Sequence, residues 1–164
     1  MKSLLKFPLI ALIAMFSFSC STESMDEGTE QIQIEETTIQ AKTIEVETLE
    51  LINDYRMSQG LNTLSDMNIV KSVAYSHTDY MLENNEISHD NFFKRSEYLK
   101  SHTGAARVSE NVAYGYSSAQ TLVKAWLASE GHRKNIEGDF TNFDISAEQN
   151  EEGRWYYTNI FIKK

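Results

Sequence analysis

Three residues that are far apart in the sequence carry side chains that could form one polar site. His89 and His132 each follow the end of a predicted helix, and Glu110 lies on a predicted strand between Val108 and Val112. Those valines should face the interior, so the Glu110 carboxylate should face it too, and a partly buried carboxylate needs a partner. Two imidazoles could be that partner, and a His–Glu–His set can also bind zinc with an open coordination position. Spacings of 21 and 22 residues carry no local geometry, so a shared site, a structural network and no contact at all remain open.

The other reactive side chains narrow the chemistry. His77 lies on the apolar face of a predicted helix and is expected to be a packed, hydrogen-bonded core histidine, whereas His102 is expected to be solvated. Cys20 is the only cysteine, so the domain that follows it has no disulfide, no cysteine nucleophile and no cysteine-ligated zinc. The sequence has no H-E-x-x-H helix, and no general base is evident if Glu110 serves as a metal ligand.

Charge is distributed unevenly along the chain. The 24 acidic residues outnumber the 15 basic ones and give a formal charge of −9. Residues 21–50 hold nine acids against a single base, Lys42, so the rest of the chain is nearly balanced. No basic stripe is present to bind phosphates, which argues against nucleic acid as a partner.

The N-terminus has the pattern of an export and anchoring signal. Lys2 and Lys6 precede an apolar run over residues 7–18, which is too short to span a bilayer but suits a signal peptide. Ser19-Cys20 at its end resembles the bacterial lipobox, so residues 1–19 are interpreted as the signal peptide and Cys20 as the site of lipidation. Residues 20–42 are then an acidic, flexible tether to the membrane, outside the cytoplasm in the cell envelope. The alternative is an ordinary secretory signal with a chance cysteine.

Hydrophobic periodicity predicts helices over 43–59 and 66–84, a short helical or irregular segment over 92–100, a strand over 108–114, a helix over 117–130, and strands over 140–147 and 154–162. Asp66 is expected to cap the second helix, and Gly131 to end the last one in a left-handed conformation. Trp126 and Trp155 are expected in the core. The last strand is apolar on both faces, which predicts helices on both sides of a sheet, an α+β fold with three layers, α-β-α.

Several short motifs then carry a family resemblance. Over residues 48–162 the sequence resembles the bacterial branch of the CAP superfamily (SCP/PR-1-like domains). The matching segments follow the family's order: N-D-Y-R at 53–56, A-Y-S-H at 74–77, S-H at 88–89, E-N-V-A at 110–113, G-H-R-K-N-I at 131–136 and Y-Y at 156–157. The resemblance implies that residues 43–164 form one three-layer α-β-α sandwich of the CAP type.

The resemblance also implies a cleft. It places His89, Glu110 and His132 at the family's cavity positions, with Ser129 and Glu130 at or near a fourth position. In relatives this cleft is associated with divalent metals, lipids and glycans. The resemblance therefore makes Zn²⁺ the candidate ion for His89, His132 and Glu110. Arg133 and Asn135 are expected to hold the neighbouring loop, and the family typically has glycine where this chain has Asp144.

Three functions follow from this reading. The first is a membrane-anchored extracytoplasmic protein whose His/Glu-lined cleft binds a small molecule, lipid, glycan or divalent metal. The second is a zinc-dependent hydrolase acting on peptides or cell-envelope material. The third is an envelope scaffold in which His89, Glu110 and His132 form only a structural polar network.

Overall fold

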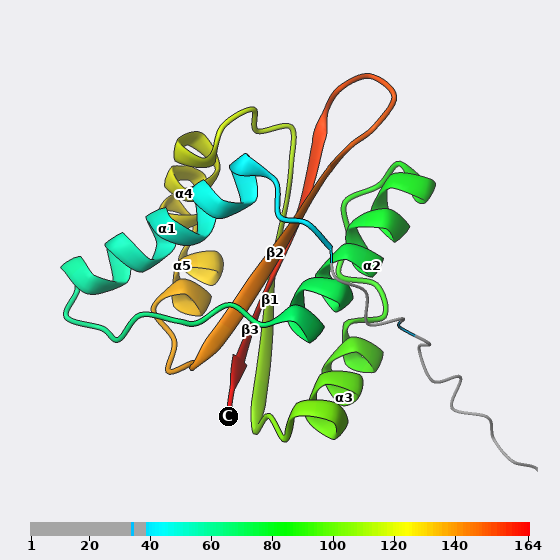
Figure 1. The fold of residues 1–164 in the computed structure, drawn as a ribbon. Helices are drawn as coiled ribbons and strands as arrows, with labels where there is room; N and C mark the ends of the chain where they lie inside the picture. The colour runs from blue at the N-terminus through cyan, green and yellow to red at the C-terminus, as the bar shows by residue number, and fades with distance from the viewer. Residues whose placement is uncertain (1–33, 35–38) are drawn as a thin grey trace, which may run out of the picture.

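A three-stranded antiparallel sheet in the order β1-β3-β2 separates two layers of helices (Figure 1). The computed structural model describes residue 34 and residues 39–164, so the predicted signal peptide, Cys20 and most of the predicted acidic tether lie outside the described residues. The elements are α1 Thr43–Ser58, α2 Asn68–Asn84, α3 Phe92–Thr103, β1 Arg107–Tyr114, α4 Ala119–Ala128, α5 Glu130–Ile136, β2 Asn142–Gln149 and β3 Trp155–Lys163. No helix within these residues is long and apolar enough to cross a bilayer.

The two faces of β3 bury different cores. Tyr157 and Phe161 pack with α1 and α4 side chains on one face, and Ile160 and Ile162 pack with α2 and α3 side chains on the other. Figure 1 shows α1, α4 and α5 on one side of the sheet, and α2 and α3 on the opposite side. The predicted α-β-α layering is therefore confirmed. Its physical cause is that β3 is apolar on both faces, so each face needs a covering layer of helices.

The sequence prediction is wrong at the end of α4. That helix ends at Ala128, and Gly131 lies inside a further helix, α5, instead of ending one in a left-handed conformation. Ser129 adopts an extended conformation, with φ −92° and ψ 120°. Its N–H donates to the carbonyls of Ala125 and Trp126, and its own carbonyl accepts the N–H of Arg133. Ser129 therefore ends α4 and begins α5. Hydrophobic periodicity does not detect this break and predicts one continuous helix.

Two smaller predictions also need correction. The residue that caps α2 is Met67, not Asp66, and its N–H donates to Asp144 Oδ2 at 3.2 Å. Trp126 is buried in the core at 2% exposure, but Trp155 is only partly buried at the start of β3. Ile34, within the segment predicted to be a flexible tether, packs against the α2/α3 core, and its carbonyl accepts the Tyr98 hydroxyl at 3.3 Å.

The outer edge of β2 is covered by a buried ion pair. Lys71 Nζ of α2 lies 2.6 Å from Glu45 Oε2 of α1, and both side chains are almost fully buried. Lys71 also donates to the Ile145 carbonyl at 2.6 Å, and Glu45 Oε1 accepts the Ala147 N–H at 2.7 Å. Buried backbone groups at a sheet edge need such partners, so this pair ties α1 and α2 to the same strand.

Asp144 lies on β2 next to that ion pair. It is 7% exposed, and burial raises the pKa of its carboxyl from 3.8 to about 6, although Lys71 and the N–H groups of Ile145 and Met67 oppose the shift. The folded protein therefore favours the neutral form of this side chain at mildly acidic pH.

Candidate functional site

Glu110 is the centre of the candidate site. It lies on β1 opposite Ile160 of β3, so its side chain points to the face that α2 and α3 cover. It is 6% exposed. The prediction that Glu110 points inward with Val108 and Val112 is confirmed, since all three share one strand face and all three are buried.

Both carboxylate oxygens of Glu110 are occupied. Arg95 of α3 donates from Nε to Oε2 at 2.9 Å and from Nη2 to Oε1 at 2.8 Å. His89 Nδ1 lies 2.9 Å from the same Oε1. Burial alone would raise the pKa of Glu110, but the hydrogen bonds from His89 and Arg95 and the charge of Arg95 hold it below its ordinary value. Glu110 is therefore an ionised, fully paired carboxylate.

The Glu110 carboxylate fixes the orientation of His89. An ionised carboxylate can only accept hydrogen bonds, so His89 Nδ1 carries the proton that it donates. In the neutral form of this ring the lone pair is on Nε2, which forms no hydrogen bond with the described residues. The His89 side chain is 53% exposed, whereas that of Glu110 is 1% exposed. This is the arrangement in which a buried carboxylate presents an imidazole nitrogen to a ligand.

His132 reaches the site from the opposite helical layer. It lies on α5, which side-chain amides tie to β1: Asn111 donates to the His132 carbonyl at 3.1 Å, and Asn135 donates to the Glu110 carbonyl at 3.2 Å and to Asn111 Oδ1 at 2.8 Å. Burial lowers the pKa of His132, and the charge of His89 lowers it further. The two imidazoles are thus within electrostatic range, with the edge strand β1 between their layers.

The predicted residues are not all brought together. His89 and Glu110 are in contact and His132 is near His89, but Glu130 points to Lys134 in an exposed ion pair of 2.7 Å. Ser129 forms the junction between α4 and α5. Within residues 34 and 39–164, no group of three or more His, Cys, Asp or Glu side chains is arranged to hold a metal ion.

The expected structural roles of two α5 residues are confirmed. Arg133 donates to the Leu127 carbonyl at 3.1 Å, which holds the junction between the helices. Asn135 makes the two contacts to β1 given above. Both therefore position α5, and with it His132.

Sequence reasoning missed two members of the Glu110 network. Arg95 is 3% exposed and supplies the main counter-charge, and His77 Nε2 lies 3.9 Å from Glu110 Oε1. His77 is the packed, hydrogen-bonded histidine that its helix face predicts, because Nε2 donates to the Ser88 carbonyl at 2.8 Å. Burial lowers its pKa. A buried glutamate favours a guanidinium partner, but the sequence does not indicate which arginine supplies it.

A hollow of about 200 Å³ adjoins the network on its α2/α3 side. Its lining consists of polar and aromatic side chains from these two helices and the turn between them: Ser76, His77, Tyr80, Asn91, Lys94 and Arg95. A hollow with a larger volume, about 350 Å³, lies elsewhere, at the start of α1 and α4. Volume therefore does not identify the His89–Glu110 site; its charges and hydrogen bonds do.

Comparison with known sequences gives a consistent result. The model of the CAP family, described as the cysteine-rich secretory protein family, matches residues 49–161. The chain is 35% identical over 128 residues to the uncharacterized membrane protein YlbC of Bacillus subtilis, covering 74% of this chain and 35% of YlbC. It is 31% identical over 105 residues to the uncharacterized protein YkwD of the same organism, covering 62% of this chain and 41% of YkwD. The aligned parts therefore span less than half of either relative.

Comparison with solved structures supports the same fold. An extracellular protein containing a SCP domain from Bacillus anthracis superposes with a TM-score of 0.64 at 28% identity, covering 73% of this chain and 40% of that chain. An outer surface protein of Borrelia burgdorferi superposes with a TM-score of 0.64 at 21% identity, covering 71% of this chain and 89% of that chain. The second likeness, at this identity, concerns the fold alone.

Proposed function

Because this chain belongs to the cysteine-rich secretory protein (CAP) family, we propose that it is a membrane-anchored, extracytoplasmic binding protein in which His89 and His132 bind an exchangeable divalent transition-metal ion. The observation that carries this proposal is the hydrogen bond of 2.9 Å between Glu110 and His89 Nδ1. This hydrogen bond orients the exposed His89 ring so that Nε2 can bind a metal ion as a ligand.

The two histidines are the type of ligand that a transition metal prefers, but they are fewer than the ligands of a typical zinc site. Imidazole nitrogen suits Zn²⁺, Cu²⁺ or Ni²⁺ better than Ca²⁺ or Mg²⁺, which prefer oxygen. Catalytic zinc sites have three protein ligands, and here the third predicted ligand, Glu110, is engaged by Arg95 and His89. We therefore assign Glu110 an orienting role and expect weak, reversible binding by two histidines.

Two observations support the membrane anchor. The apolar run over 7–18 ends in Ser19-Cys20 and is followed by an acidic segment, which suits a lipidated N-terminus. The relative YlbC is named a membrane protein. A stable anchor needs more than one acyl chain, and lipoprotein acylation of one cysteine supplies this. Metabolic labelling with an alkyne fatty acid should label the wild type and not Cys20→Ser.

Titration calorimetry with Zn²⁺ on the full-length chain in detergent tests the metal proposal. We expect one saturable binding event in the wild type, loss of at least tenfold in affinity in His89→Ala and in His132→Ala, and no heat in the double variant. His102→Ala is the matched control, because His102 is an exposed histidine on α3 that stacks on Tyr98. Identical heats for the wild type and the double variant would overturn the proposal.

The alternative of a zinc-dependent hydrolase has no specific observation in its favour. A general base must be free to take a proton from water, and both oxygens of Glu110 accept hydrogen bonds from charged or polar donors. Incubation of the chain with casein and with peptidoglycan, with and without Zn²⁺, is the direct measurement, and we expect no turnover.

A further inference from the structure

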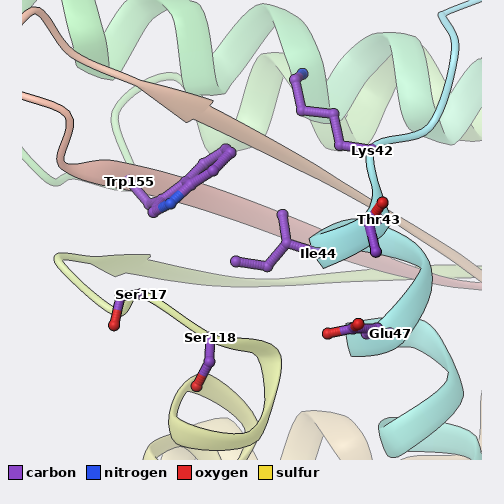
Figure 2. A pocket seen from close by; sticks show the side chains of 7 residues that line it. All are labelled: Lys42, Thr43, Ile44, Glu47, Ser117, Ser118 and Trp155. Carbon is purple, nitrogen blue, oxygen red and sulfur yellow. The ribbon is translucent and has the colours of Figure 1, made fainter.

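A second hollow of the described residues is separate from the His89–Glu110 site. It has a volume of about 350 Å³ and lies between the start of β3, the first turn of α1 and the loop that leads into α4. Seven residues line it: Lys42, Thr43, Ile44, Glu47, Ser117, Ser118 and Trp155. Figure 2 shows these side chains, with that of Ile44 extending toward Trp155. The volume is at the lower end of the range of about 300–1,000 Å³ typical of small-molecule sites.

The apolar part of this hollow is an aromatic platform. Trp155 is only partly buried, in contrast to Trp126, and packs on Tyr157 with ring centroids 6.2 Å apart and an interplanar angle of 29°. Ile44 is also partly buried and joins the same core cluster. An indole that is supported from behind and open in front offers a flat apolar surface with little entropy to lose on binding.

The polar part of the hollow has unused hydrogen-bonding capacity. Within the described part of the chain, the side chains of Thr43, Glu47 and Ser117 form no hydrogen bond or ion pair. The other two polar side chains are engaged. Lys42 pairs with Glu148, and the Ser118 hydroxyl caps α4 by accepting the Thr121 N–H. The free groups are therefore two hydroxyls and one carboxylate, with a local charge close to −1.

The loop that carries Ser117 is fixed before any ligand arrives. The Gly115 N–H donates to the Trp155 carbonyl at 2.8 Å, and the Tyr157 hydroxyl donates to the Tyr116 carbonyl at 2.6 Å. Gly115 has φ +84°, a left-handed conformation that suits glycine at this turn. The platform and the hydroxyls thus keep their relative positions, which reduces the entropy cost of binding.

We propose that this hollow is a saccharide-binding site, with the pyranose ring on Trp155 and its hydroxyls on Glu47, Ser117 and Thr43. A pyranose has an apolar C–H face for the indole and a rim of hydroxyl donors, and a carboxylate accepts two such donors in charge-assisted bonds. The charge of Glu47 disfavours anionic ligands, and the polar rim disfavours an acyl chain. A neutral mono- or disaccharide is the ligand class that uses all parts of the lining.

Tryptophan fluorescence of the full-length chain in detergent tests this site. The probes are N,N′-diacetylchitobiose, cellobiose and maltose, each titrated to high millimolar concentration. Trp126 is 2% exposed, so Trp155 supplies the solvent-sensitive part of the signal. We expect a saturable change with at least one disaccharide, binding about tenfold weaker in Glu47→Gln, and loss of binding in Trp155→Ala. Glu50→Gln, an exposed carboxylate on the same helix, is the matched control and should bind like the wild type.

Two further measurements keep the outcome clear. If Trp155→Ala does not fold, as judged by circular dichroism, then Glu47→Gln and Ser117→Ala carry the test through saturation-transfer NMR, which needs no tryptophan signal. Binding should persist in the presence of a chelator and in the His89→Ala/His132→Ala variant, which separates this site from the metal site. No saturable signal with any of the three disaccharides, or unchanged affinity in both Glu47→Gln and Ser117→Ala, would overturn the proposal.

Discussion

Arg95 and Glu110 form a two-point ion pair, with Nε 2.9 Å from Oε2 and Nη2 2.8 Å from Oε1, and both side chains are more than nine-tenths buried. The same Oε1 accepts His89 Nδ1. A single carboxylate therefore joins α3, β1 and the turn before α3, and it sets the tautomer of the exposed imidazole. Arg95 therefore helps to position His89 indirectly, because it holds the carboxylate that His89 contacts.

Arg95→Met should destabilise the fold strongly. It leaves a buried carboxylate without its main counter-charge, which costs roughly 3–5 kcal/mol of unfolding free energy. The loss should be largest near pH 7, where Glu110 is ionised, and should shrink as the pH falls below 4.5 and the carboxyl can take a proton. Urea unfolding at pH 7 and pH 4 measures both. Lys100→Met, which breaks the exposed pair with Glu97, is the control and should change stability by less than about 1 kcal/mol. An equal effect of the two variants would contradict the role of Arg95.

Metal affinity should depend on pH through the imidazoles. Burial and the His89 charge lower the pKa of His132 below 6.5, so His132 is neutral and able to bind at pH 7.5. We expect constant Zn²⁺ affinity between pH 8 and about 6.5, and a steep decline at lower pH as protons compete with the ion. Calorimetry across pH 5–8 checks this. Affinity that stayed constant down to pH 5 would exclude histidine as the ligand.

Asn135→Ala should weaken the metal site without touching a ligand. Its amide donates to the Glu110 carbonyl and to Asn111 Oδ1 and thereby holds α5 against β1. Removal of both bonds leaves buried acceptors and should lower the unfolding free energy by about 1–3 kcal/mol. Because α5 carries His132, we expect Zn²⁺ affinity to fall several-fold. Lys134→Ala, on the exposed side of α5, should leave both quantities nearly unchanged.

Asp144→Asn should make the protein more stable at neutral pH. The carboxyl has a folded-state pKa of about 6 against 3.8 in the unfolded chain, so folding favours its neutral form. That contribution is fully present below pH 3.8 and is lost as the pH rises through 6, a change of about 3 kcal/mol. The difference in stability between variant and wild type should therefore increase from pH 4 to pH 7.5, which denaturant unfolding can measure. A difference independent of pH would mean that Asp144 does not titrate as its burial implies.

The layered fold was predictable because the spacing of apolar residues indicates the buried face of each element. The last strand has apolar residues at consecutive positions, and Leu122, Val123 and Trp126 follow helical spacing, so period alone gives the layers. The break between α4 and α5 was not predictable in this way. It depends on the extended conformation of one residue, Ser129, which local propensity does not specify.

The candidate site was predictable in part. The alternation around Glu110 indicates that the carboxylate is buried, but it does not identify the partner. Arg95 comes from a helix whose register against β1 is a tertiary property, so sequence spacing could not place it. Trp155 was misassigned for a related reason: its strand position gives the face, but exposure depends on how far α1 and the α4 loop extend over it.

The ion pair between Glu45 and Lys71 has a consequence for how this protein can meet its neighbours. Together with Ser65, which exchanges backbone hydrogen bonds with Thr141 and Phe143, it occupies the outward-facing Phe143 N–H, Ile145 carbonyl and Ala147 N–H of β2. A partner that binds by adding its own strand to a sheet needs those groups free. Addition of a partner's strand at the β2 edge of the sheet is thus disfavoured.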